Sequence, residues 1–331
     1  MTGTLQNKVI IKSTGSFAPD QIIENDYFEK IGSSDEWIHS NLGIRRRHIA
    51  APEETTSDLA SKAAINALEK AELKATDLDL IILATATPDR LAPSCACFVQ
   101  EKIGAKNAVA FDISAVCSGA LFAMSVGRQF VASGAYKNVM VIGADTFSKI
   151  TNWERRDAVF FGDGAGAVIL NANDQDTNQG FVDFQLYTEG SGKFHFNIPA
   201  GGSEKPASNK TIANGEHYFQ MNGKEVFNKA TQELPKAIER ILESNNWNTS
   251  AIDYVIPHQP SIRILQKVAA STGIPFEKVL TNMDEYANTS GGTIPILLDE
   301  TLRNEIIKEG DKVLFAAIGA GWTWGTALYQ F

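Results

Sequence analysis

Cys117 stands where an apolar run meets a segment with helical character, in the stretch FDISAVCSGALFAM. A cysteine in the first turn of a helix faces free backbone N–H groups and the positive end of the helix dipole, and both favour the thiolate. The same position also suits a small buried core residue. By itself the residue is therefore as compatible with a structural cysteine as with a nucleophile.

Two other side chains occupy turns where they could assist a thiol. His258 follows a predicted strand in VIPHQP, and Asn288 lies in EYANTSGGTIP. The carboxyl ends of strands are where α/β sheets bind ligands, and Cys, His and Asn form a known nucleophilic set. Each of the two residues, taken singly, is also typical of an ordinary turn.

The order of these three residues does not fix the reaction. In papain-like proteases His and Asn lie roughly 130–150 residues after the Cys, and His258 falls in that range after Cys117. The chain lacks the C-G-S-C-W signature of those enzymes. A cysteine-dependent thioester hydrolase or acyltransferase that uses the same three side chains is the alternative left open.

The elements that must hold these residues alternate between strands and helices. Short runs rich in Val and Ile predict buried strands at 8–13, 78–85, 108–114, 138–144, 165–171, 252–257 and 312–319. Helical patterns lie between them at 56–71, 118–134, 224–245 and 260–273. We expect a Thr56 or Ser57 cap on the first helix and a Gly273 cap at the end of the last. This alternation predicts an α/β protein built in layers.

The order of elements repeats once along the chain, although no residue-level repeat is visible. We therefore expect two similar halves, with the nucleophile cysteine in residues 1–172 and the His and Asn in residues 173–331. The stretch 189–216 is rich in Gly, Ser, Asn and Lys and is long for a connection. Such a loop is either mobile or functional.

Composition excludes several classes of protein. The net charge of −9 over 331 residues argues against a general nucleic-acid binder. No secretory signal is visible, and no apolar run approaches the ~20 residues of a membrane span. Three cysteines suit reduced thiols in a cytoplasm better than a disulfide framework. The spacing of Cys, His and acidic residues suggests no metal site.

Six motifs in order resemble one family. They are SSDEWIHSNLGIRRRHIA, FDISAVCSGA, FFGDGAGAVIL, IPHQPSIRI, ANTSGGTIPILLDE and GAGWTWGTAL. Together they resemble the β-ketoacyl-acyl-carrier-protein synthase III family of thiolase-fold condensing enzymes, over nearly the whole chain. The resemblance implies an α/β thiolase fold, two similar halves packed as five αβαβα layers, and a homodimer.

The resemblance also implies a reaction. Cys117 would take an acyl group from acyl-CoA, which is a substrate, so no cofactor is implied. His258 and Asn288 would stabilise the enolate formed when malonyl-acyl-carrier protein loses carbon dioxide, and that carbanion would attack the acyl-cysteine. The backbone N–H groups of Cys117 and Ala320 would form the oxyanion hole. Thiolases need a second catalytic cysteine, and no cysteine follows Cys117.

Contacts to the two substrates follow from the same resemblance. Trp37 and Arg155 match positions that pack on the CoA adenine, and Gly223 matches a position beside the pantetheine. Arg263 matches the residue on which the acidic carrier protein docks.

Three positions depart from the family pattern. Asn41 stands where the family often has an arginine, which implies altered binding of CoA. Ala92 stands where well-studied members give a phenylalanine to the acyl pocket across the dimer, and Ile318 replaces a second common phenylalanine. Both changes predict a pocket wider than acetyl needs, and hence a longer starter.

Overall fold

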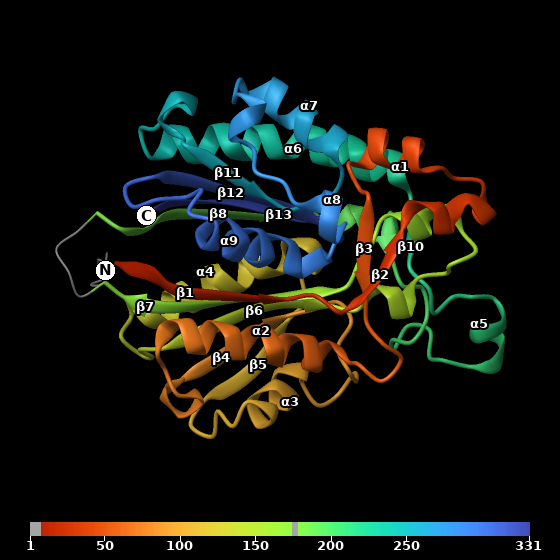
Figure 1. Cartoon of the computed structure of the whole chain (residues 1–331), viewed down its shortest axis with the longest axis horizontal. Helices are drawn as coiled ribbons and strands as arrows, with labels where there is room; N and C mark the ends of the chain where they lie inside the picture. Colours follow the sequence, from red (N-terminus) through yellow and green to blue (C-terminus); the bar gives the residue numbers. More distant parts are fainter. Residues whose placement is uncertain (1–7, 174–177) are drawn as a thin grey trace.

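The computed structural model describes residues 8–173 and 178–331. Two sheets lie one above the other, with helices between them and on both outer faces (Figure 1). In these layers the helices are α2 (Thr56–Ala71) and α3 (Cys95–Lys102) below, α4 (Gly119–Ala132) and α9 (Thr293–Arg303) between, and α6 (Gly223–Ser244) and α7 (Ile262–Thr272) above. The five predicted layers are therefore confirmed.

The lower sheet has the strand order β1-β7-β6-β4-β5. Its strands are β1 (Val9–Phe17), β4 (Leu80–Ala84), β5 (Val109–Ile113), β6 (Val139–Asp145) and β7 (Gly164–Ala172). β4 pairs in parallel with β5 and β6, whereas β7 is antiparallel to β1 and β6. Every residue of β4 and β6 is buried, because helices cover both faces of the sheet. This double cover explains their unbroken apolar runs.

The upper sheet repeats this arrangement with one strand fewer. Its order is β11-β12-β13-β8, made of β8 (Gly180–Thr188), β11 (Tyr254–Pro257), β12 (Lys312–Gly319) and β13 (Thr323–Gln330). In place of a fifth strand there is an isolated parallel bridge between Val255 and Val279. One apolar core reaches from the lower sheet to the upper one. The boundary between halves at 172/173 stays a prediction.

The cap of α2 differs from the expected one. Thr55, not Thr56 or Ser57, is the N-cap, and it forms a capping box with Asp58. The box needs an acid three residues after the cap, and only Thr55 satisfies that spacing. The side chains of Thr56 and Ser57 instead bond the Thr87 carbonyl and the Asp89 carboxylate. Gly273 caps α7 in the left-handed conformation, as predicted.

The stretch 189–216 is not a featureless loop. It contains β9 (Phe196–Asn197), which pairs with β10 (Gln220–Met221), and the short helix α5 (Asn209–Ala213) at the edge of the molecule (Figure 1). Glu189 and Trp322 exchange two backbone hydrogen bonds of 2.9 and 2.6 Å, which fasten the start of this stretch to the turn between β12 and β13.

The remaining elements complete the rim and the surface. They are β2 (Gln21–Glu24), β3 (Arg46–Ile49), α1 (Asp35–Leu42), α8 (Met283–Tyr286) and several short 3-10 helices. Within the described parts of the chain, no helix is long and apolar enough to cross a membrane.

Candidate active site

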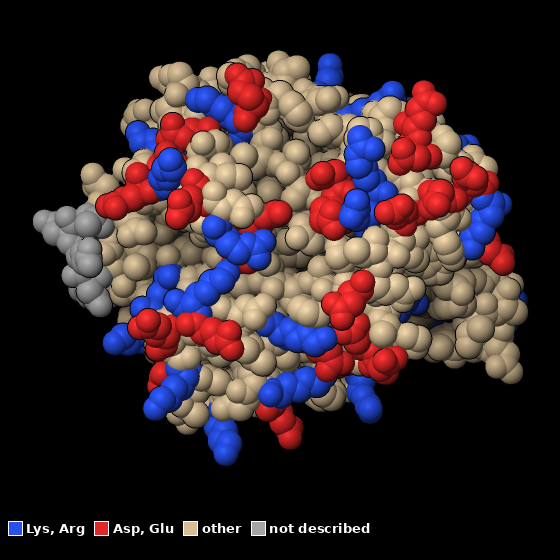
Figure 2. Space-filling model, viewed as in Figure 1, with Lys and Arg blue, Asp and Glu red and all other residues tan. Residues whose placement is uncertain are grey.

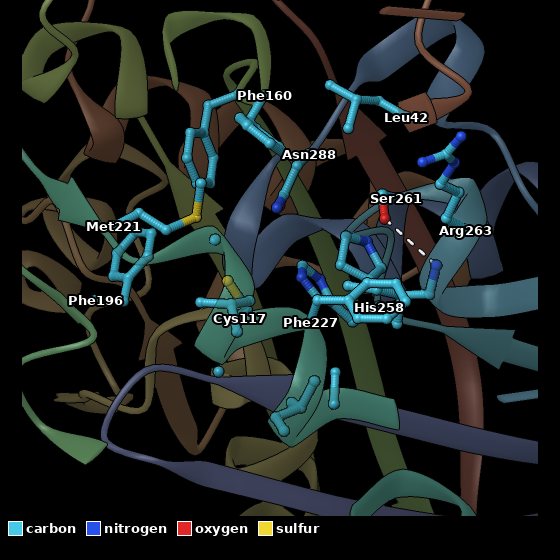
Figure 3. A pocket seen from close by; sticks show the side chains of 18 of the residues that line it. Leu42, Cys117, Phe160, Phe196, Met221, Phe227, His258, Ser261, Arg263 and Asn288 are labelled. Carbon is cyan, nitrogen blue, oxygen red and sulfur yellow. Dashed lines mark hydrogen bonds between the residues drawn. The ribbon is translucent and has the colours of Figure 1, made fainter. Parts of the chain in front are cut away.

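A cavity of about 250 Å³ contains all three residues of the predicted nucleophilic set. Cys117 lies in the 3-10 turn Val116–Ser118 that leads into α4, and His258 directly follows β11. Asn288 lies between α8 and the 3-10 turn Ser290–Gly292. Figure 3 shows the three side chains around one space, although they come from distant parts of the chain.

Cys117 sits on a strained turn. The residue before it, Val116, has a φ of 47°, which a β-branched side chain rarely adopts. Strain of this kind persists where the surrounding structure enforces it, and such places cluster at active sites. The thiol lies 3.7 Å from the hydroxyl of Ser290.

The acidity of this thiol differs from the expectation. Burial raises the pKa of Cys117 to about 12, although the Ser290 hydroxyl and a backbone N–H act in the opposite direction. The helix start favours the anion, but Cys117 is only 9% exposed and loses most of its solvation. The expectation of a lowered thiol pKa is therefore wrong for this structure.

His258 is held as a neutral imidazole. Its backbone N–H donates to the Ala316 carbonyl at 2.8 Å, and its ring Nδ1 lies 2.8 Å from Thr293 Oγ1. Burial lowers the pKa of His258 to about 3. The ring therefore carries no charge at neutral pH and can offer one N–H donor.

Asn288 is oriented by its own turn. Its Oδ1 accepts a hydrogen bond of 2.8 Å from the Ser290 backbone N–H. The other side-chain group, Nδ2, is thereby turned into the cavity (Figure 3). The preceding residue, Ala287, also has a positive φ, of 56°. The site thus presents an uncharged amide donor beside an uncharged imidazole.

A buried carboxylate ties the turn that follows Asn288 to the segment after β4. Asp145, at the end of β6, is fully buried. Its Oδ1 accepts from the Thr85 hydroxyl and from the backbone of Ala86 and Thr87, and its Oδ2 accepts from the Gly291 N–H. Burial raises the pKa of Asp145, while these hydrogen bonds lower it. Asp145 was not predicted from the sequence. An acidic residue at the end of a strongly apolar strand was the feature that could have indicated it.

The predicted oxyanion donors come from two turns that lie next to each other. Ala320 lines the cavity with Cys117. A Cβ on the neighbouring Gly319 would lie 2.9 Å from the Ala115 carbonyl and 3.0 Å from the Cys117 nitrogen. Only glycine lets β12 approach the nucleophile turn this closely. The Thr323 hydroxyl, 2.7 Å from that of Ser118, ties the two turns together.

Most of the other predicted contact residues lie along the same cavity. Those that line it are Trp37, Gly223, Arg263, Ile318 and Ala320. The substituted Asn41 lines it too, and its side chain donates to the Trp37 carbonyl at 2.7 Å.

Two predicted residues do not line the cavity of their own chain. Arg155 pairs with Asp157 at 2.6 Å. The neighbouring Arg156 lies over Trp37 instead, 5.5 Å from the ring centre. The contact of Arg155 with the CoA adenine stays a prediction. Ala92 is exposed on the loop before α3.

An aromatic wall next to Cys117 was not foreseen. Phe160, Phe196 and Met221 face the thiol across the cavity (Figure 3). Phe161 also lines the cavity and has its ring centre 5.0 Å from that of Phe219, on which Phe196 stacks at 5.6 Å. Ile318 lacks the aromatic ring that is common at its position, but Phe160 and Phe196 supply aromatic bulk on this wall of the cavity. The closely spaced phenylalanines in FF at 160–161 and FHF at 194–196 could have indicated this wall in the sequence.

Two stacked sheets with helices between and outside them, and a cysteine entering the buried helix, define the class of thiolase-fold enzymes. A family model described as 3-oxoacyl-[acyl-carrier-protein] synthase III matches residues 111–190, and the model of its C-terminal part matches residues 242–331.

Comparison with known proteins gives the family. Beta-ketoacyl-[acyl-carrier-protein] synthase III of Clostridioides difficile (strain 630) is 45% identical over 329 residues, covering 99% of both chains. The protein of that name from Solibacter usitatus (strain Ellin6076) is 42% identical over 327 residues, covering 98% of this chain and 99% of that one.

A solved structure agrees with this result. The crystal structure of 3-oxoacyl-[acyl-carrier-protein] synthase III from Aquifex aeolicus VF5 has a TM-score of 0.89 and 39% identity, covering 98% of this chain and 100% of that one. The chain belongs to the β-ketoacyl-acyl-carrier-protein synthase III family.

Proposed function

We propose that this chain takes an acyl group from acyl-CoA onto Cys117 and joins it to malonyl-acyl-carrier protein by decarboxylative Claisen condensation. The observation that carries the proposal is the meeting of three groups in one cavity: a thiol at a helix start, a neutral imidazole and an inward amide. Relatives that bear the name of this enzyme over almost their whole length support it.

The first half-reaction is acyl transfer. The Cys117 sulfur forms a bond to the acyl carbon, the bond from that carbon to the CoA sulfur breaks, and the thiol proton ends on CoA. Negative charge develops on the acyl oxygen during attack. The backbone N–H groups of Cys117 and Ala320 are the donors we assign to that oxygen, because preorganised donors in a dry site stabilise it strongly.

The second half-reaction is condensation. The malonyl carboxylate leaves as carbon dioxide, and its electron pair forms an enolate on the thioester. His258 and Asn288 are the donors assigned to the enolate oxygen. The carbanion attacks the acyl carbon on Cys117, and the sulfur leaves as a thiolate that regains a proton. Because both donors are neutral, they favour the enolate without holding the starting carboxylate in place.

The mouth of the cavity suits CoA and an acidic carrier protein. Trp37 and Arg155 are proposed to hold the adenine, and Gly223 leaves room for the pantetheine. Arg263 is proposed as the docking residue for the carrier protein. Figure 2 shows acidic and basic side chains interspersed over the face it displays, without a broad basic field there. We expect attraction of the carrier to depend on basic residues at the cavity mouth, such as Arg263.

A homodimer is proposed on the exposed edge of the lower sheet. β5 is the last strand of that sheet, and its Val109 is 49% exposed. An unpaired strand edge is a template for pairing with a second chain. Leu91, on the loop beside Ala92, is 86% exposed. Pairing across β5 would cover this apolar surface and bring the partner subunit's Ala92 to the acyl pocket. All three cysteines are free, which suits the cytoplasmic location we propose.

The deciding experiment is intact-mass measurement after mixing the protein with a panel of acyl-CoAs. An adduct of acyl mass is expected on the native chain and on Cys95→Ala and Cys97→Ala. It is expected to be absent on Cys117→Ala. An adduct that survives Cys117→Ala would contradict the proposal. Free acid without a β-ketoacyl product, when malonyl-acyl-carrier protein is added, would favour the hydrolase.

A further inference from the structure

The hydroxyl of Thr293 lies between an imidazole nitrogen and a backbone carbonyl. Its Oγ1 is 2.8 Å from Nδ1 of His258 and 3.0 Å from the carbonyl oxygen of Ser290. A threonine hydroxyl has one proton, so it can donate to only one of them. The choice decides which nitrogen of His258 carries the imidazole proton. If Thr293 donates to Ser290, Nδ1 must be protonated; if it donates to Nδ1, the proton is on Nε2.

The carbonyl of Ser290 has less need of this proton. It already accepts a hydrogen bond from the backbone N–H of Thr293, in the 3-10 turn Ser290–Gly292. Nδ1 of His258 faces the Thr293 hydroxyl at 2.8 Å, and the residue is only 3% exposed, so little water reaches the ring. An imidazole nitrogen is also more basic than an amide oxygen. Both arguments favour donation from Thr293 to Nδ1.

We propose that Thr293 is a positioning residue that holds His258 as the Nε2–H tautomer. With Nδ1 occupied by the threonine hydroxyl, the remaining N–H of the ring is on the side away from Thr293. There it faces the same cavity as Nδ2 of Asn288, whose Oδ1 accepts from the Ser290 N–H. One short segment, Asn288–Thr293, therefore orients both donors assigned to the enolate oxygen. The role in condensation rests on the function proposed above, but the tautomer itself does not.

The first test is spectroscopic and needs no substrate. Long-range ¹H–¹⁵N correlation spectra of the labelled protein distinguish protonated from bare imidazole nitrogens, and His258→Gln identifies the His258 signals among those of the five histidines. A protonated Nε2 and a bare Nδ1 are expected in the native protein. A protonated Nδ1 would overturn the proposal. This result is independent of whether the protein condenses anything.

The second test separates hydroxyl from shape. Thr293→Val keeps the shape and removes the hydroxyl, whereas Thr293→Ser keeps the hydroxyl. Thr293→Val should still form the acyl-enzyme, but carbon dioxide release from malonyl-acyl-carrier protein should fall roughly 10- to 100-fold. That is less than the ~10²–10³ typical of deleting a donor outright. Thr293→Ser should retain the native rate and spectrum.

Two outcomes of this second test would also overturn the proposal. One is native decarboxylation by Thr293→Val. The other is an equal loss in Thr293→Val and Thr293→Ser, because that would show a purely steric role. If Thr293→Val does not fold, the native spectrum still decides.

Discussion

The thiol of Cys117 shows that position in a helix and burial in a cavity can oppose each other. The helix start was visible in the sequence, but the loss of solvation depends on residues that are distant in the chain. Because burial raises the pKa of this thiol to about 12, only a small fraction is thiolate at neutral pH. Alkylation by iodoacetamide should therefore become faster with each pH unit beyond pH 9, without a plateau near neutrality.

Peptide mapping by mass spectrometry would follow Cys117 separately from the exposed Cys97 in this measurement. Cys117→Ala gives the background of the other cysteines. A rate at Cys117 that levels off below pH 8 would mean that the helix start outweighs burial after all.

Asn288 offers the clearest separation of the two half-reactions. Asn288→Ala removes a donor from the enolate site but leaves the backbone donors of Cys117 and Ala320. We expect a normal acyl-enzyme and a condensation rate lower by ~10²–10³. Cys117→Ala should do the reverse and release carbon dioxide from malonyl-acyl-carrier protein without condensation. Adduct mass and carbon dioxide release measure the two steps.

Asn288→Asp is the matched control, because it keeps the size of the side chain and replaces the amide donor with a carboxylate. It should be at least as poor in condensation as Asn288→Ala. Condensation at the native rate by Asn288→Ala would reduce Asn288 to an ordinary turn residue.

At the same scale, the sequence allowed prediction of the residues that perform the chemistry better than of those that orient them. Cys117, His258 and Asn288 stood in recognisable turns, and the structure brings them together. Asp145, Ser290 and Thr293 are common residue types without a distinctive pattern. Their importance depends on which hydroxyl or carboxylate faces which turn after folding, and periodicity does not contain that information.

At the scale of elements, prediction succeeded for strands that carry a continuous apolar run. The run at 78–85 contains β4, all of whose residues are buried. β8 was missed because it is only half-buried along most of its length and carries polar residues such as Asp183 and Gln185. A strand with one solvent-exposed face carries polar residues on that face and so lacks the continuous apolar run by which the other strands were predicted.

The stretch 189–216 gives the prediction at this scale. A Cβ on Gly192 would lie only 1.9 Å from the indole nitrogen of Trp322, a residue that lines the cavity beside Ala320. Gly192→Ala should therefore displace Trp322 and destabilise the protein by about 1–3 kcal/mol, as overpacking does. Acyl transfer should also slow, because Ala320 adjoins the displaced turn. Thermal unfolding and the rate of adduct formation measure the two effects.

Gly190→Ala is the control for this change. It lies in the same short 3-10 turn, but a Cβ there would meet no atom within 4 Å. Unchanged stability and acyl transfer are expected. If Gly192→Ala behaved like Gly190→Ala, the contact with Trp322 would not hold the turn in place.

At the scale of the whole molecule, the layered fold followed from alternating elements and from the resemblance, but the acyl pocket did not. Ala92 and Ile318 suggested a wide pocket, yet the chain's own wall carries Phe160 and Phe196. In the proposed dimer, room for a longer starter would come from the side that the partner subunit's Ala92 closes. Pocket size in a dimer depends on two chains, and one sequence read alone cannot fix it.

A heterodimer tests this directly. One chain carries Cys117→Ala and Ala92→Phe, and the other is native and bears a different affinity tag. The only Cys117 thiol then lies in a cavity faced by the introduced phenylalanine of the other chain. Native protein should prefer starters longer than acetyl, because each buried methylene contributes about 0.8 kcal/mol. The heterodimer should lose that preference, roughly tenfold for two methylene groups, in a panel of acyl-CoAs read by adduct formation.

The control heterodimer carries Cys117→Ala alone on the mutated chain and should retain the native preference. Because Ala92 is exposed in its own chain, the substitution itself should not disturb folding. A change of preference that occurs only when Ala92→Phe and the reactive Cys117 share one chain would place Ala92 in its own pocket and contradict the exchange across the dimer. If acetyl-CoA is the best starter of the native protein, the longer-starter prediction is wrong, and the aromatic wall of Phe160 and Phe196 sets the limit instead.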